Sequence, residues 1–200
     1  PDATKYYKSA LEEDSTFALA YYGLAYRYKW NYDSRSGDLI NKALVYIESA
    51  PEKERLFIRA MAVTDDQSIA IPMYEKILEK YPNEKLAYWE IGDIYYHDDM
   101  ADQSIPYFEK CLELDPTFEY AIQHLHMAFG DTYRNNDMID LANRALALFP
   151  GVKKYKKRQF DAYSSAGRFK EYFQLAKELE ESEEPIVNPD EIFGEGFKYS

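Results

Sequence analysis

Three prolines divide the middle of the chain into segments of equal length. Pro82, Pro116 and Pro150 lie 34 residues apart, and each closes a stretch whose apolar residues recur at helical spacing. A fixed period of this length is the signature of a helical repeat protein. Each unit of such a protein packs mainly on its neighbours, so the period constrains the fold of this chain more than any other feature.

The clearest unit begins at Lys85 and reads KLAYWEIGDIYYHDDMADQSIPYFEKCLELDP. Its pattern predicts two amphipathic helices, joined by a short polar turn and stopped by Pro116. With Lys85 as position 1, small residues occupy positions 8, 20 and 27, and large residues occupy positions 4, 7, 11 and 24. These residues are, in the same order, Gly92, Ser104, Cys111, Tyr88, Ile91, Tyr95 and Phe108. Small residues let two helices cross closely and large ones fill the remaining gaps, so we expect an antiparallel helix pair.

The same pattern can be laid over most of the chain. It predicts the second helix of a truncated repeat in residues 1–15, full repeats in residues 16–50, 51–84, 85–118, 119–152 and 153–182, and a capping C-terminal tail in residues 183–200. Pro72 predicts that the second helix of residues 51–84 begins near residues 68–71. Gly167 falls at the turn of the last repeat, where it would supply a left-handed conformation. Because the sequence begins in the middle of a repeat, we expect it to be a mature fragment or an excised domain.

These residue types at these positions resemble the tetratricopeptide repeat (TPR) family, over roughly Ala3 to Glu181. The resemblance implies an all-α fold: a TPR-type αα-superhelix, which is a solenoid of antiparallel helix pairs, with about eleven helices and a tail. Residues 15–25, STFALAYYGLA, are also loosely similar to TPR regions of bacterial signalling enzymes and transcriptional regulators.

The resemblance further implies where a ligand would bind. In this family the concave wall is lined by the first helix of each repeat, chiefly through positions 2, 5, 6, 9, 12 and 13. On this chain these positions predict a peptide-binding face that includes Tyr22, Tyr26, Trp89, Asp93, Tyr96, Gln123, Met127, Lys154, Lys157 and Arg158. Lys29, Glu90 and His124 belong to the same set of positions. Tyr22, Tyr26, Trp89 and Tyr96 are not needed for packing within a repeat, so we expect peptide anchors; the alternative is that they pack on a neighbouring repeat.

A run of basic residues, KKYKKR, lies at residues 153–158 of an otherwise acidic chain. The simplest interpretation is a solvated helix face. The alternative is an acidic-peptide site, because Lys154 and Arg158 occupy positions where chaperone-binding family members carry part of a carboxylate clamp. The rest of that clamp is missing, since Trp89, Asp93 and His124 stand where the family has Lys, Asn and Asn.

Composition narrows the class of partner. A formal net charge of −12 argues against nucleic acid and anionic membrane surfaces, which both require a positive field. No apolar run of about 18 residues is present, which argues against membrane insertion. The single cysteine, Cys111, excludes an internal disulfide and a cysteine-based zinc site. The compartment stays open, with the cytoplasm slightly favoured.

Catalytic and metal sites are not indicated. His124 and His126 are two residues apart and so face different sides of a helix, and His97 lies beside two aspartates in a predicted turn. No glycine-rich phosphate loop and no activated nucleophile can be recognised. We therefore predict no enzymatic activity, no cofactor and no metal.

The sequence thus predicts a protein–protein interaction scaffold that binds a partner peptide or helix in its concave groove. The alternative is a structural or regulatory TPR segment of a larger signalling enzyme or transcriptional regulator. Such a segment would act through intramolecular or homo-oligomeric contacts.

Overall fold

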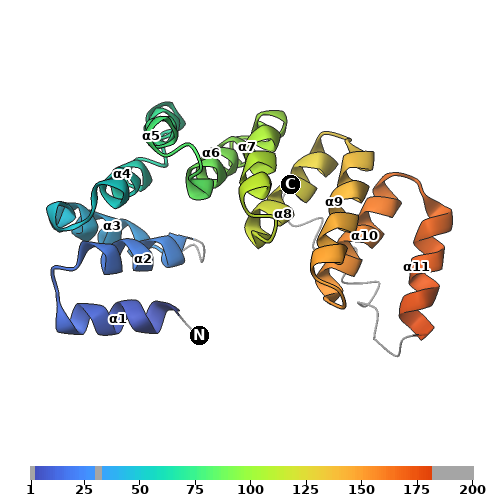
Figure 1. The fold of residues 1–200 in the computed structure, drawn as a ribbon, viewed down its shortest axis with the longest axis horizontal. Coiled ribbons are helices and arrows are strands. Elements are labelled where there is room, and N and C mark those ends of the chain that lie inside the picture. The colour runs from blue at the N-terminus through green and yellow to red at the C-terminus, as the bar shows by residue number, and fades with distance from the viewer. Residues whose placement is uncertain (1–2, 30–32, 182–200) are drawn as a thin grey trace. The chain divides into compact units, whose positions relative to one another are not determined.

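The computed structural model of the chain describes residues 3–29 and 33–181 (Figure 1). Within these residues it contains eleven α-helices and no strand, which confirms the predicted all-α solenoid of helix pairs. The C-terminal tail, predicted to cap the last helix, lies outside the described residues. No helix in the described part of the chain is both long and apolar enough to cross a membrane.

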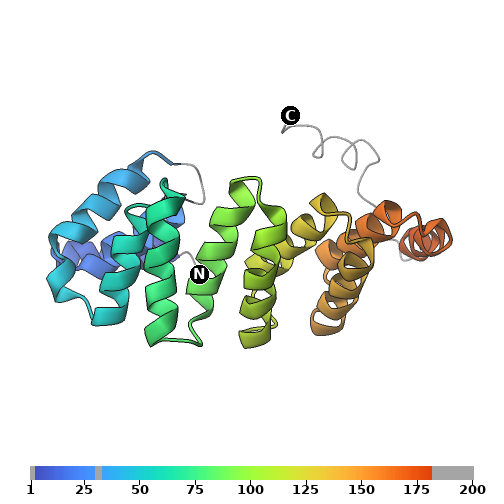
Figure 2. The same cartoon turned by 90° about the horizontal axis from the view of Figure 1, so that it is seen from above.

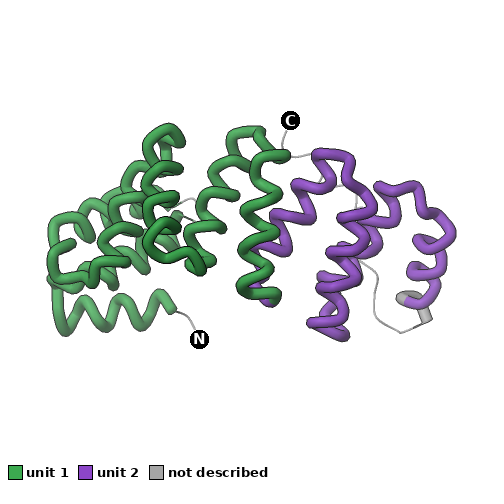
Figure 3. Tube along the Cα trace, turned by 45° about the horizontal axis from the view of Figure 1, so that its top comes forward, with its two compact units in different colours: residues 1–116 green, residues 117–200 purple. Residues whose placement is uncertain are grey.

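The chain divides into two compact units, which are coloured separately in Figure 3. Unit 1 comprises residues 1–116 and unit 2 comprises residues 117–200. The helices of unit 1 are α1 (Ala3–Glu13), α2 (Ala18–Lys29), α3 (Arg35–Val45), α4 (Glu52–Met61), α5 (Gln67–Lys80), α6 (Lys85–His97) and α7 (Ala101–Leu114), with a short 3-10 helix, η1, at Ile47–Ser49. The helices of unit 2 are α8 (Glu119–Asp131), α9 (Asn135–Leu148), α10 (Lys153–Ser165) and α11 (Phe169–Glu181).

Each unit is a row of helix hairpins. In unit 1, α2 packs on α3, α4 on α5, and α6 on α7, while α1 packs on α2 (Figure 2). In unit 2, α8 packs on α9 and α10 on α11. The first helices α6, α8 and α10 begin at Lys85, Glu119 and Lys153, so the sequence period of 34 residues is also the period of the helices.

The core of unit 1 runs from one hairpin into the next. One buried cluster joins both helices of the second hairpin to the first helix of the third: Phe57, Ala60, Ala70, Ile71, Tyr74, Ile77, Ala87, Ile91 and Ile94. This is the arrangement expected when each repeat can bury its apolar face only against a neighbour. The first helices consequently have a fixed place beside each other within the unit.

The two helices of the third hairpin approach closely at a glycine. A Cβ atom added to Gly92 would lie 2.7 Å from Cε1 of Phe108, which is closer than real side chains approach. Ser104 and Cys111, the other small residues of the pattern, are fully buried. The small residues therefore act as predicted, by making room for the facing helix.

Helices α5 and α7 each contain a proline at their sixth residue, Pro72 and Pro106. Helix α5 begins at Gln67, one residue before the predicted range. The reason is the side chain of Asp66, whose Oδ1 accepts a hydrogen bond from the backbone N–H of Ser68 at 3.1 Å and so caps the helix. This aspartate was the sequence signal that the prediction missed.

The turns inside three hairpins share one backbone conformation. Asp99, Tyr133 and Gly167 lie 34 residues apart, and their φ angles are 59°, 58° and 66°. This left-handed region is strained for residues with a Cβ atom and free for glycine. The prediction for Gly167 is confirmed. Asp99 and Tyr133 adopt the same left-handed conformation, in which their Cβ atoms are sterically strained.

The close approach at Gly92 predicts the effect of a substitution on stability. Gly92→Ala should lower the free energy of unfolding by about 1–3 kcal/mol, because the Phe108 ring must shift to admit the new methyl group. Gly37→Ala in α3 is the matched control, since its Cβ would meet nothing within 4 Å. The control should gain about 0.5–1 kcal/mol through lower unfolded-state entropy. Urea unfolding followed by circular dichroism measures both, and equal midpoints would contradict the packing argument.

The turn at Tyr133 predicts a stabilising change. Its side chain is 87% exposed, so removing it sacrifices little packing. Tyr133→Gly should raise the free energy of unfolding by about 1 kcal/mol, because glycine relieves the left-handed strain. Tyr133→Ala removes the same ring but keeps the Cβ atom, so it should bring no gain in the urea midpoint.

Candidate ligand-binding surface of the first helices

Helices α2 and α6 carry the residues of the predicted peptide-binding face that belong to unit 1. Tyr22, Tyr26 and Tyr96 are part-buried, so each keeps some surface for a ligand. The rings of Tyr22 and Tyr26 lie one helical turn apart, with centroids separated by 6.2 Å. Tyr22 also packs against the apolar core. The pKa of its hydroxyl is raised mainly by this burial and, to a smaller extent, by the charge of the Glu90 carboxylate. These tyrosines are rigid apolar groups with a polar tip, which suits a binding surface.

Trp89 does not fit the predicted role. Its side chain is completely buried, and its ring lies 5.4 Å from that of Phe108 in the same hairpin. The expectation that Trp89 is not needed for packing within its repeat was therefore wrong. Phe108 fills the space beside Gly92, and the indole packs against the Phe108 ring, so Trp89 belongs to the core.

Glu90 is a buried acid on α6, with 2% of its surface exposed. Its Oε2 atom lies 3.5 Å from Nζ of Lys29 on α2 and accepts a hydrogen bond from the hydroxyl of Tyr74 at 3.4 Å. Its Oε1 atom has no hydrogen-bond partner among the described residues. Burial raises the pKa of this carboxyl group, Lys29 opposes that rise, and Asp93 adds to it. A carboxylate held in this way is only partly compensated.

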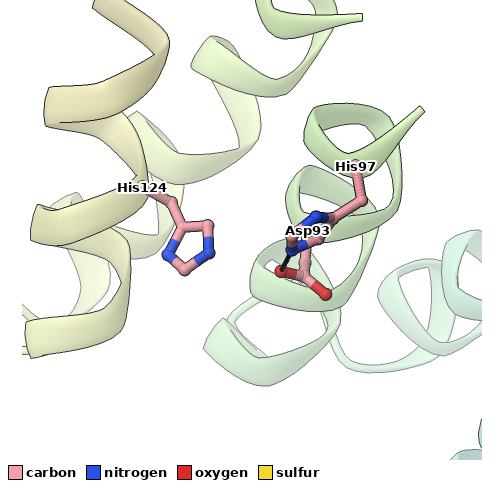
Figure 4. Close-up of side chains that lie close together, drawn as sticks. All are labelled: Asp93, His97 and His124. Carbon is pink, nitrogen blue, oxygen red and sulfur yellow. Dashed lines mark ion pairs between the residues drawn. The ribbon is translucent and has the colours of Figure 1, made fainter. Parts of the chain in front are cut away.

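Asp93 lies one turn further along α6 and is also buried. Its Oδ1 atom is 3.4 Å from Nε2 of His97, which stands at the exposed end of the helix (Figure 4). The hydrogen bond to Asp93 raises the pKa of His97 above its ordinary value, and partial burial opposes the rise. Asp93 and His97 therefore form a pair whose charge depends on pH.

The predicted residues of unit 2 lie on α8 and α10. Gln123 is part-buried and Met127 is exposed, and both belong to α8. On α10, Lys154 is exposed and forms an ion pair with Glu119, so its ammonium group already has an acidic neighbour. Such a pair between exposed side chains contributes little stability and can be exchanged for another anion.

Lys157 and Arg158 are part-buried, unlike the solvated charges of a simple surface run. The Nε atom of Arg158 is buried and has no hydrogen-bond partner among the described residues. Burial also lowers the pKa of its guanidinium group. Asp161 lies one turn after Lys157 on α10. Burial raises the pKa of its carboxyl group, and the charges of Lys157 and Arg158 only partly oppose this rise. This part of α10 thus holds a basic group that the described residues do not fully satisfy.

His126 was not predicted as a site residue, and the structure gives it a structural role. Its Nε2 donates a hydrogen bond to the backbone oxygen of Arg158 at 3.0 Å, which links α8 to α10. Burial lowers the pKa of this imidazole to about 4, so it is neutral at physiological pH. The bulky histidine in a small-residue position is explained by this link between neighbouring first helices.

The sequence places Glu90 and Arg158 on the predicted face, but it does not show that their polar atoms are buried. Both occupy position 6 of their repeats, and both have a buried polar atom without a described partner. Their burial depends on neighbouring helices, such as the approach of Lys29 from α2 to α6. A charged residue at position 6 was the only available signal, and it does not reveal burial.

Solved structures with a similar fold include PilW, described as a widely conserved type IV pilus biogenesis factor. PilW is 15% identical over 88% of this chain and 83% of its own, with a TM-score of 0.67. MamA of AMB-1 is 17% identical, over 90% and 99% of the two chains, with a TM-score of 0.59. MamA of Desulfovibrio magneticus RS-1 is 18% identical, over 84% and 97%, with a TM-score of 0.56.

These low identities show the fold alone, which is a TPR-type solenoid of helix pairs. No family model matches the chain, and no curated protein matches it.

The two histidine environments predict opposite titrations. By NMR, His97 should titrate above its ordinary value of about 6.5 and His126 near pH 4. The His97–Asp93 pair should stabilise the fold below about pH 6.5, and this contribution is lost as pH rises through the pKa of folded His97. His126 affects the pH dependence of stability in the opposite direction, because its pKa is lower in the folded than in the unfolded chain. The free energy of unfolding should therefore fall as pH drops from about 6.5 towards 4.

Asp93→Asn is the control for the first assignment. It removes the carboxylate and should return the pKa of His97 towards its ordinary value or below, while His126 should not change. Titration of both imidazoles near pH 6.5 in the wild-type chain would contradict both environments.

Proposed function

We propose that this chain is a non-catalytic scaffold that binds a segment of a partner protein, either an extended peptide or a helix. Each unit would offer its own binding surface on the exposed side of its first helices, which are α2 and α6 in unit 1 and α8 and α10 in unit 2. The TPR-type fold supports this proposal, because helical solenoids present long faces for partner segments and need no catalytic group.

One observation carries the proposal: buried polar atoms that have no hydrogen-bond partner in the described part of the chain occur at the same place in two repeats. Glu90 Oε1 and Arg158 Nε both belong to position 6 of a first helix. A buried polar atom that lacks a hydrogen bond costs roughly 1–3 kcal/mol, so such atoms are rare in folded proteins and require an explanation. A bound partner segment that supplies the missing contacts explains both.

The surrounding side chains also suit a protein partner. Tyr26 and Tyr96 in unit 1 are part-buried, whereas Tyr120 and Met127 in unit 2 are exposed by 45% and 39%. Tyrosine, methionine and arginine are enriched where proteins contact each other. Each unit by itself therefore offers aromatic or apolar contacts beside a charged group.

A second function is favoured by a different part of the chain. Phe169 and Phe173 lie on α11 and are 61% and 66% exposed. Large exposed apolar residues on one helix are typical of a face that contacts another protein surface. This supports the alternative of a structural or regulatory segment that acts through intramolecular or homo-oligomeric contacts.

Peptide display separates the two functions. Peptides selected from a random library on the immobilised wild-type chain should bind the triple variant Tyr96→Ala, Met127→Ala, Lys157→Ala at least about tenfold more weakly, since each lost interface contact weakens binding. The matched control is Lys42→Ala, Val45→Ala, Leu148→Ala, which removes comparable exposed side chains from second helices and should bind as the wild type does.

Two outcomes would overturn the proposal. One is a library that yields no binder, and the other is equal binding by the two triple variants. If sedimentation instead shows a concentration-dependent oligomer that Phe169→Ser and Phe173→Ser dissolve, the alternative function is supported.

A further inference from the structure

Helix α6 of unit 1 presents two buried carboxylates on one face. Glu90 and Asp93 are three residues apart, which places them one above the other on the helix, and they are only 2% and 4% exposed. Buried carboxylates are normally matched by cations and hydrogen-bond donors that satisfy both oxygens. Glu90 and Asp93 together therefore require cations or donors for four carboxylate oxygens.

The internal cations do not complete the site. Lys29 approaches Glu90 on Oε2, at 3.5 Å, and His97 approaches Asp93. Neither contact satisfies Oε1 of Glu90, which is buried and lacks a hydrogen-bond partner in the described part of the chain, although hydrogen bonding by Tyr26 to the carboxyl group partly opposes the rise in its pKa that burial causes. A nine-tenths buried acceptor that finds no donor among residues 3–29 and 33–181 leaves a place for a donor supplied by a ligand.

Lys29 shows how such a donor could arrive. Its side chain is 28% exposed, while the Glu90 side chain that it reaches is 3% exposed. A cation on a long apolar stem thus runs from the surface of α2 to the buried acid on α6. At 3.5 Å the ammonium lies further from the oxygen than the roughly 2.8 Å of a good charged hydrogen bond. The pair is loose enough to be exchanged.

Phenol groups lie beside Glu90. Tyr22 and Tyr26 come from α2 and Tyr74 from α5, and the Tyr74 hydroxyl donates to Oε2 of Glu90 at 3.4 Å. Tyr26 also hydrogen-bonds to this carboxyl group, and the Glu90 charge, after burial, raises the pKa values of the Tyr22 and Tyr74 hydroxyls. Aromatic rings beside a buried acid favour a planar cation, which can stack on a ring while it donates to an oxygen.

We infer that unit 1 binds an arginine side chain of a partner segment, with the guanidinium group donating to Oε1 of Glu90 between the tyrosines of α2. This inference rests on the proposed function and names the ligand chemistry for one of its two units. Arginine is preferred over lysine because its donors form a planar fork that can reach Oε1 while another N–H meets Oε2. Lys29 is then an internal competitor that covers the acid until the ligand arrives.

The test uses the full chain and a positional-scanning library of nonapeptides, each with one position fixed as a single amino acid. The wild-type chain should prefer arginine at one fixed position. The best peptide is then compared with twins that carry citrulline or lysine there. Citrulline keeps the shape and removes the charge, so it should bind about 10- to 100-fold more weakly, as expected when a charged hydrogen bond to a buried acid is lost. The lysine twin should fall in between.

Two variants assign the effect to the acid and its competitor. Glu90→Gln should weaken the arginine peptide about as much as citrulline does and should abolish the difference between the arginine and citrulline peptides. Lys29→Met should strengthen the arginine peptide, because the internal cation no longer competes. The controls Glu79→Gln and Lys76→Met change the same charges on the exposed side of α5 and should bind as the wild type does. Circular dichroism confirms that every variant is folded.

The failures of the two proposals differ. If peptides bind without an arginine preference, or if the arginine–citrulline difference persists in Glu90→Gln, this inference is overturned and the scaffold function stands. If no library peptide binds at all, the scaffold function itself fails. Because the citrulline twin leaves the protein unchanged, the test holds even if Glu90→Gln unfolds.

Discussion

The absence of a Cβ atom at Gly92 is the constraint on which the third hairpin depends, because it lets the Phe108 ring lie against the backbone of α6. Helix pairs that cross this closely become rigid bodies with one apolar face left over, and that face can be buried only on the next pair. The shared cluster from Phe57 to Ile94 is the result in unit 1. Hairpin packing thus determines which sides of the first helices remain available to a ligand.

The sequence was sufficient for the helix pairs and their period and insufficient for the burial of individual side chains. Helix pairs, their period and the left-handed turn at Gly167 follow from residue types at fixed spacing, and all are observed. Trp89 was misassigned because position alone does not say whether a large side chain turns towards its own hairpin. The burial of Glu90 was unpredictable for a related reason: Lys29 reaches it from a helix two repeats earlier, a contact that no local pattern encodes.

Position 6 carries side chains of opposite charge in two repeats of one scaffold. In the third repeat it is the acid Glu90, and in the fifth it is the base Arg158, each with a buried polar atom that its own unit leaves without a described partner. Since the packing positions carry the stability of the hairpin, a side chain at position 6 can change its charge without changing the fold. A buried polar atom that stays without a hydrogen bond costs stability, and both atoms lack one among the described residues.

The hydrogen bond from His126 to residue 158 has a consequence for how such a protein can evolve. It ends on a main-chain oxygen, and every amino acid provides that oxygen. The link between α8 and α10 is therefore indifferent to which side chain residue 158 carries. Substitutions at residue 158 can therefore change its side chain while this connection between adjacent repeats is kept. The side chain that this link requires is the imidazole of His126, whereas Arg158 contributes only its main-chain oxygen.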